Sequence, residues 1–250
     1  MHKNQIRKFV GGAAAICGGV LALHGLIATS HAAQSDAGSV EADGSVTTFK
    51  ARHVARWPFY GSGELSTYHS QIVMSESDDS VGVMLVSPNA YCGDIIVRFD
   101  VMPLRAATAL VTNLATTSLD SEELTFPEGY DANVTYMFET PSMYNFIYHA
   151  APHSREGPFL RRFPEPGNEL LSPASEHFVE MGKYSSVEFG RVGSRVWFAV
   201  DGETAVEYHD DAPLQDGHVV LRIRGTAHER AGALFRDIEI ENQPDPAICG

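Results

Sequence analysis

The stretch VEFGRVGSRVWFAVDGETAVEY, residues 187–208, decides the fold because it holds three strand patterns and the two turns that join them. Gly193-Ser194 is a two-residue hairpin loop whose first position favours a positive φ, and Asp201-Gly202 is the commonest sequence signal for a type I′ turn. Between the turns the core candidates are Val196, Phe198 and Val200, which alternate with Arg195, Trp197 and Ala199. The stretch therefore predicts an antiparallel meander with one apolar face.

The same alternation extends outward from the meander. GHVVLRIRG at 217–225 places apolar and basic residues on opposite faces, and ALFRDIEIEN at 233–242 alternates around an expected bulge. Short β-branched or aromatic runs separated by Gly, Pro, Asn and Asp predict an all-β fold, a sandwich jelly roll of two curved antiparallel sheets. The expected strands are 47–54, 70–75, 80–86, 94–102, 107–113, 133–138, 143–149, 185–192, 195–200, 203–208, 217–224 and 233–241. Residues 104–117 are the one run for which a helix is an alternative.

The N-terminus has the pattern of an export signal. Lys3, Arg7 and Lys8 precede the uncharged run 9–23, and Ser30-His31-Ala32 fits a small-x-small cleavage site. An uncleaved membrane anchor is the alternative for this run. The resulting expectation is a signal peptide at 1–32, a disordered linker at 33–45, the jelly-roll domain at 46–243 and a tail at 244–250, in a periplasmic or secreted protein without membrane insertion after cleavage.

Charge and cysteine content narrow the possible partners. The chain of 250 residues has a formal charge of −14, and loss of the three leader cations takes it to −17. So acidic a chain is a poor nucleic-acid binder, because such binding depends on neutralising phosphates. Cys92 and Cys249 remain after cleavage and predict one disulfide in an oxidising compartment, with two free thiols as the alternative. A monomer or weak oligomer is expected.

The C-terminal half resembles concanavalin A-like, lectin/glucanase-type jelly rolls. The elements that carry this likeness are the strand with Glu188, the VDG turn, HDD followed by PL, LRIRG and the closing FRDI strand. The chain is most similar to the YesU-like proteins of pectin-type polysaccharide utilisation, and more distantly to keto-disaccharide hydrolase-like domains. MYNFIYHAAPHSREGPFLRRFPEPG resembles the Tyr-rich strand and Arg-containing loop of the YesU-like family. The resemblance covers roughly residues 90–242 and implies a carbohydrate ligand on the concave sheet.

Polar residues of several strands are candidates to line one groove. Those outside the Tyr-rich segment are Arg98, Asp100, Asn133, Thr135, Glu188, Trp197, Arg222 and Arg224. The densest group lies within 144–162: Tyr144, Asn145, Tyr148, His149, His153, Arg155, Arg161 and Arg162. Any one of them also suits an ordinary sheet surface, so convergence in a single groove is the expectation to be tested.

The chemistry of this group suits acidic sugars. Arg binds a carboxylate bidentately, Tyr offers a flat face and a hydroxyl, and His exchanges a proton near neutral pH. We expect His149, His153, Tyr144 and Glu188 as catalytic candidates. The expected ligand contacts are Asn145, Tyr148, Arg155, Arg161, Arg162, Arg98, Trp197, Arg222 and Arg224.

Several function classes remain open. The protein is expected to cleave a glycan, as a lyase or glycoside hydrolase, or to be a non-catalytic carbohydrate-binding module. A structural envelope protein with an empty groove is a third interpretation. No glucanase E-x-D-x-x-E or zinc-site spacing is found, and no cofactor is expected. HDD at 209–211 could give oxygens to a structural Ca²⁺, although a solvated loop before Pro213 is the favoured interpretation.

Overall fold

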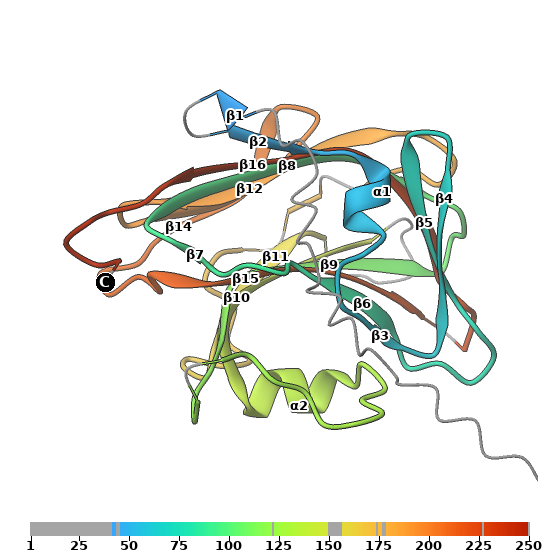
Figure 1. The fold of residues 1–250 in the computed structure, drawn as a ribbon, viewed down its shortest axis with the longest axis horizontal. Coiled ribbons are helices and arrows are strands. Elements are labelled where there is room, and N and C mark those ends of the chain that lie inside the picture. Colours follow the sequence, from blue (N-terminus) through green and yellow to red (C-terminus); the bar gives the residue numbers. More distant parts are fainter. Residues whose placement is uncertain are drawn as a thin grey trace, which may run out of the picture. The chain divides into compact units, whose positions relative to one another are not determined.

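The computed structural model describes residues 42–43, 46–121, 123–149, 157–173, 175–176, 179–226 and 228–249, with the backbone alone at 42, 43 and 149. Within these ranges the chain forms two antiparallel sheets of nine and seven strands. The expected all-β sandwich is therefore confirmed. Figure 1 shows the sheets as stacked layers, with the helix α2 (Val134–Glu139) on the outer side of the second sheet.

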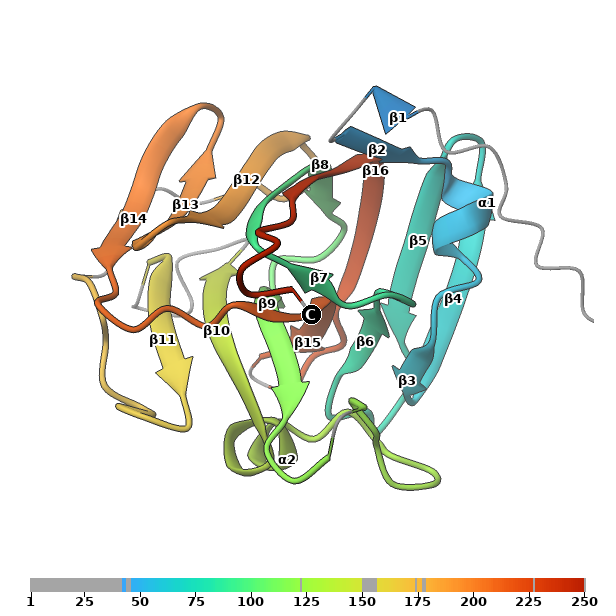
Figure 2. The ribbon, with the colours of Figure 1, turned by 60° about the vertical axis from the view of Figure 1, so that its left-hand side comes forward.

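The first sheet has the strand order β1-β2-β16-β8-β12-β13-β14, and β5 joins it by pairing with β16 and β4. Its strands are β1 Ala42–Asp43, β2 Val46–Phe49, β4 Gly63–Tyr68, β5 Gln71–Glu76, β8 Asp94–Pro103, β12 Ser185–Val192, β13 Arg195–Val200, β14 Glu203–His209 and β16 Gly232–Gln243. Figure 2 shows the β13–β14 hairpin and the β4–β5 hairpin at opposite ends of this sheet.

The second sheet has the order β11-β10-β9-β15-β6-β3, with β7 paired to β15. Its strands are β3 Phe59–Gly61, β6 Val83–Val86, β7 Tyr91–Cys92, β9 Thr108–Ser118, β10 Pro141–His149, β11 Phe159–Phe163 and β15 Asp216–Gly225. The helix alternative for 104–117 is excluded, because β9 occupies most of that run.

The main core lies between the sheets and follows the alternation of the sequence. From the first sheet, Val196, Phe198 and Val200 are at most 4% exposed. The ring of Phe198 packs against Phe146 and Tyr148 of β10, with centroids 5.9 and 4.6 Å apart. Burial of these rings removes a large apolar area from water, which is the main driving force for closing the sandwich.

The predicted turns and bulge are present. Gly193 has φ +55°, and Asp201 and Gly202 have φ +52° and +83°, as a type I′ turn requires. The Asp201 carboxylate also accepts a hydrogen bond from the Ser186 amide at 2.9 Å. In β16 the register shifts between Arg236 and Glu239, so a bulge keeps Phe235 and Ile238 on the same core face.

A second, smaller core covers the outer face of the second sheet. A segment of the chain, residues 123–140, crosses that face and ends in α2; we call it the cap segment. Met137 and Ala132 from the cap segment pack with Met143, Phe163 and Val220 of the sheet. Strand β9 is consequently buried on both faces over most of its length and lacks the alternation of a half-exposed strand.

Three sequence expectations on secondary structure were wrong or incomplete. The strand expected at 133–138 is instead the helix α2 (Val134–Glu139), because the Asn133 side chain accepts a hydrogen bond from the Thr135 amide as an N-cap and Met137 is buried against the sheet. The first expected strand ends at Phe49 and continues as the short helix α1 (Ala51–Val54). Strands β1, β3, β4, β7 and β11 lie in stretches where none was expected, and β1 falls within the expected disordered linker 33–45.

Candidate functional site

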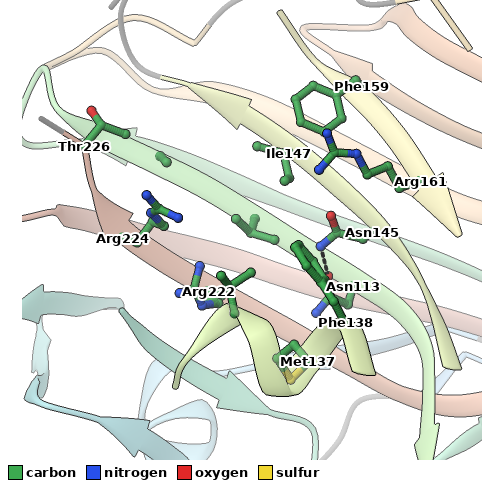
Figure 3. A pocket seen from close by; sticks show the side chains of 13 residues that line it. Asn113, Met137, Phe138, Asn145, Ile147, Phe159, Arg161, Arg222, Arg224 and Thr226 are labelled. Atoms are coloured by element: carbon green, nitrogen blue, oxygen red, sulfur yellow. Dashed lines mark hydrogen bonds between the residues drawn. The ribbon is translucent and has the colours of Figure 1, made fainter. Parts of the chain in front are cut away.

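A cleft of ≈440 Å³ lies on the outer face of the second sheet, beside α2. Its floor comes from β9, β10, β11 and β15, and its wall from the cap segment (Figure 3). The lining residues are Ala109, Val111, Asn113, Val134, Met137, Phe138, Asn145, Ile147, Phe159, Arg161, Arg222, Arg224 and Thr226. A concave surface of this size with apolar walls and a few polar groups is typical of small-ligand sites.

The strand register brings these residues together. Asn145 of β10 is paired with both Asn113 of β9 and Arg161 of β11. One pleat further along, Val111 is paired with Ile147 on one side and Arg222 on the other. Because side chains alternate between the faces of a strand, residues two apart share a face, so both rows face the cleft.

Arg222 is the most unusual residue of the cleft. Its side chain is buried, and it donates hydrogen bonds only to main-chain oxygens, from Nη2 to Val81 O at 2.8 Å and Ala132 O at 3.0 Å. No described carboxylate lies within ion-pair distance of it. Burial, with a smaller contribution from the charge of Arg224, lowers the pKa of the guanidinium to about 10, against the weaker opposing effects of Tyr130, Glu76 and Asp131, so it is charged at neutral pH. A buried cation with no carboxylate in direct contact is incompletely compensated, and an anionic ligand would relieve this.

Arg224 and the remaining lining strengthen this positive character. Arg224 is exposed and makes no hydrogen bond or ion pair with another described residue. Arg161 also lines the cleft, with its guanidinium 4.6 Å from the ring centroid of Phe159. No Asp or Glu is among the lining residues, although the whole chain carries a formal charge of −14. The cleft is thus a local cationic site on an acidic protein.

The floor also offers neutral hydrogen-bonding groups. Nδ2 of Asn145 donates to Oδ1 of Asn113 at 2.7 Å, as Figure 3 shows. Oδ1 of Asn145 is buried without a hydrogen-bond partner among the described residues. Phe159, Ile147 and Phe138 give apolar surface beside this pair. The amide groups can exchange hydrogen bonds with the hydroxyls of a sugar, and the apolar side chains can pack against the C–H face of its ring.

The structure places three of the expected groove residues elsewhere. Tyr144 and Tyr148 are on the inner face of β10, within the main core. The Tyr144 hydroxyl donates to Asp210 Oδ2 at 2.6 Å and accepts from the Leu214 amide at 3.0 Å, while burial raises the pKa of this phenol. Arg162 forms an ion pair with the same Asp210, at 3.1 Å. Tyr144 and Arg162 hold the 210–214 loop, and none of the three residues lines the cleft.

Glu188, Trp197 and Arg98 lie on the outer face of the first sheet. Glu188 accepts from Arg98 Nε at 2.8 Å and from Trp197 Nε1 at 2.9 Å. All three line a separate hollow on that sheet. Since the two outer faces are on opposite sides of the sandwich, the expected single groove containing Glu188 together with Arg222 does not form. Of the predicted residues, the described cleft unites Asn145, Arg161, Arg222 and Arg224.

The histidine candidates are only partly placed. Residue 149 is the last residue of β10, and its backbone is in register with Ala109, a lining residue of the cleft. His153 and Arg155 lie outside the described residues. The roles expected for these three therefore stay predictions.

Two further expectations concern cysteines and cations. The predicted disulfide between Cys92 and Cys249 is confirmed, with Cα atoms 5.7 Å apart. Asp210 of the HDD sequence is buried and engaged by Tyr144, Arg162 and the Ala212 amide. In the part of the chain that the structure describes, no three His, Cys, Asp or Glu residues are arranged to hold a metal ion. No described helix is long and apolar enough to cross a membrane.

The apolar wall of the cleft was missed by sequence reasoning. Met137, Phe138 and Val134 belong to a segment that was expected to be a strand, so their place over the neighbouring sheet had no local signal. Phe159 and Ile147 were within the predicted dense segment. Their alternation with Leu160 and Phe146 was the signal that could have placed them on the outer face.

Solved structures with the same fold include proteins that bind or cleave carbohydrate. A protein of unknown function with a galectin-like fold from Bacillus subtilis has a TM-score of 0.65 and 18% identity, over 76% of this chain and 91% of that one. A β-1,3-1,4-glucanase (lichenase) from a mouse hindgut metagenome has 0.53 and 10%, over 79% and 99%. The Emp46p carbohydrate recognition domain, in metal-free form, has 0.54 and 6%, over 75% and 88%.

The fold is therefore a concanavalin A-like/galectin-like jelly roll. No protein-family model matches the sequence, and no curated protein matches it significantly. The resemblance to YesU-like proteins stays an expectation. Jelly rolls of this kind host unrelated activities, so the function has to be argued from the cleft itself.

Proposed function

We propose that this chain is an exported protein that binds an acidic oligosaccharide in the cleft of the second sheet. The observation that carries the proposal is the buried guanidinium of Arg222, which together with Arg224 lines a cleft without any acidic side chain. A uronate carboxylate would supply the direct ion-pair partner that Arg222 lacks among the described residues, and Arg binds carboxylates in a bidentate, orientation-specific way. The carbohydrate-binding and glycan-cleaving proteins of the same fold support a glycan as the carrier of that anion.

The remainder of the cleft supports a sugar rather than an inorganic anion. Asn145 and Asn113 present amide groups to hydroxyls, and Phe159 and Ile147 present apolar surface to the C–H face of a ring. The disulfide is typical of proteins outside the cytoplasm, where extracellular glycans are met. Secretion or a periplasmic location, with cleavage of residues 1–32, is part of the proposal.

The test compares acidic with neutral glycans. An array carrying galacturonate, glucuronate and mannuronate oligosaccharides, sulfated oligosaccharides and the matching neutral oligomers would be probed with the mature protein, and hits measured by calorimetry. We expect binding to the uronate series and none to the neutral series. Preference for sulfated glycans would change the anion assigned, and equal binding of neutral and acidic glycans, or no binding, would overturn the proposal.

A charge-neutralising variant tests the site itself. Arg224→Gln removes an exposed guanidinium that no described residue needs, so the fold should persist. We expect the association constant for the uronate ligand to fall about tenfold, as for loss of one charge-assisted hydrogen bond. Arg52→Gln, at an exposed position of α1, makes the same charge change away from the cleft and should leave binding unchanged.

One observation favours a second candidate function, cleavage of the bound glycan by β-elimination. The backbone of residue 149 is paired with Ala109 at the cleft, so a histidine lies in the strand that forms the cleft floor. A lyase needs a base for the α-proton beside the cation that neutralises the carboxylate. Ultraviolet absorbance of an unsaturated uronate product, lost in His149→Ala with affinity retained, would identify a lyase. New reducing ends without that absorbance would instead indicate hydrolysis. If neither signal appears although the glycan binds, the protein is a binding module.

A further inference from the structure

The cleft is continued beyond Arg224 by a second, more polar hollow of ≈550 Å³. Arg224 and Val134 line both, so the two spaces adjoin at these residues. Figure 3 shows Arg224 at the opposite end of the cleft from Arg161. The other side chains around the second hollow come from the turn after β5, the start of α2 and the 225–230 loop. A ligand longer than one sugar could therefore extend past Arg224.

Glu76, the last residue of β5, lines this second hollow and is 5% exposed. Its Oε2 accepts hydrogen bonds from the Gly225 amide at 2.7 Å and the Ala231 amide at 2.6 Å, which holds the two ends of the 225–231 loop. Its Oε1 is buried and has no hydrogen-bond partner among the described residues. Oε2 of this carboxylate thus stabilises the loop, whereas Oε1 makes no hydrogen bond with a described residue.

An unpartnered buried carboxylate oxygen requires a donor. A metal ion is a poor candidate for this place, since within the described ranges no three acidic, His or Cys side chains are gathered to hold one. Ser77 and Asn133 of the lining are neutral and polar and can exchange hydrogen bonds with hydroxyls; the other charged lining residues are Asp79, Glu229 and Arg230. A sugar hydroxyl satisfies the oxygen without introducing a second charge.

We propose that the second hollow is a further sugar subsite, in which Glu76 Oε1 accepts a hydrogen bond from a hydroxyl of the unit next to the acidic sugar held at Arg222 and Arg224. This inference rests on the proposed function and narrows it. The ligand is an oligosaccharide of at least two units, with an anionic group at one position and a hydroxyl donor at the next. Glu76, Asp79 and Glu229 of the lining would repel a second uronate there, and Arg230 is already paired with Asp78 at 3.2 Å, so the adjacent unit is neutral.

The main test is Glu76→Gln. The Gln side chain keeps one oxygen for the Gly225 and Ala231 amides and replaces the free acceptor with a donor. For the best acidic oligosaccharide on the array, we expect calorimetry to show an association constant reduced about tenfold or more. Affinity for the free uronic acid of the same ligand should be unchanged. Glu64→Gln, an exposed carboxylate on the neighbouring strand β4, is the matched control and should alter neither affinity.

Ser77→Phe is a second variant that does not touch the buried carboxylate. Ser77 is exposed at the rim of the hollow, so a phenyl ring there fills the subsite without disturbing the core. This variant too should lower the association constant for the oligosaccharide and leave that for the free uronic acid unchanged. If both variants bind the oligosaccharide as the parent does, the subsite proposal is overturned and Oε1 is satisfied by water alone. If the parent binds no acidic glycan, the proposed function itself fails, and this inference with it.

Discussion

At the scale of single residues, Arg162 and Arg222 have different surroundings, and the difference indicates a different role for each. Arg162 has a carboxylate partner, Asp210, in a buried network with the Tyr144 hydroxyl, so its charge is compensated within the fold. Arg222 is more deeply buried than Arg162, with only 2% of the residue exposed, and the groups that accept its hydrogen bonds are neutral carbonyl oxygens. An ion pair between two residues of the fold stabilises the structure. A buried guanidinium that lines a cleft and contacts no carboxylate directly is instead a candidate for ligand binding.

Tyr144→Phe tests the structural assignment of that network. Loss of the hydroxyl removes a donor from Asp210 and an acceptor from the Leu214 amide, so the free energy of unfolding should fall by about 1–3 kcal/mol. Affinity for the acidic glycan should not change, because the hydroxyl faces the 210–214 loop. Urea unfolding and calorimetry on the same preparation measure both quantities. Lost affinity with unchanged stability would instead return Tyr144 to the list of ligand contacts.

At the scale of elements, the meander depends on its turns and the cleft depends on the cap segment. The Asp201-Gly202 turn needs two positive φ values, which set the register of β13 against β14. The cap segment covers the outer face of the second sheet and turns an open surface into a cleft with one wall. The turn is formed by residues adjacent in sequence, whereas the cleft depends on a contact between segments that are distant in sequence.

Gly202→Val tests the contribution of the Asp201-Gly202 turn. A Cβ at this position would contact nothing within 4 Å, so the cost is backbone strain alone at φ +83°. We expect a loss of about 1–3 kcal/mol in the free energy of unfolding, measured by urea denaturation. Thr204→Val, at an exposed and extended position two residues on, should change it by less than about 0.5 kcal/mol. Equal effects of the two substitutions would show that the turn does not govern the hairpin.

At the scale of the whole molecule, one covalent bond closes the chain from β7 to its C-terminal end. Cys92 and Cys249 are 157 residues apart, so their bond encloses most of the described residues. The Asn242 side chain adds hydrogen bonds to the carbonyls of Cys92 and Asp94, both at 2.9 Å. The last strand is thereby attached to the sandwich by both covalent and hydrogen bonds.

Replacing both cysteines by alanine tests the importance of this closure. In the chain-entropy account, removing a cross-link of this length lowers the free energy of unfolding by about 4–5 kcal/mol. Urea unfolding of the parent and the double variant, without reductant, would show the difference as a lower midpoint. An unchanged midpoint would mean that the tail separates from the sandwich before the main transition.

The parts of the fold that the sequence predicted well are those encoded in short range. Alternation in 195–200 and 217–224, together with two glycine turns, was sufficient for the meander and the sandwich class. Strand β11 was missed because its Arg161 and Arg162 conceal the apolar pattern, and it is defined by pairing with β10 alone. For α2, the β-branched and aromatic residues favoured a strand, and an N-cap with burial of Met137 outweighed that preference.

What the sequence by itself determined about this protein is its class, its turns, the inward-facing residues of its strong strands and the cysteine pair. These follow from period-two alternation and backbone preferences, which act over a few residues. The tertiary structure alone decided which polar residues share a cavity: it set Glu188 and Trp197 apart from Arg222 and placed Glu76 next to Arg224. Both results depend on which sheet a strand joins, and the partners that decide this are far away in the chain.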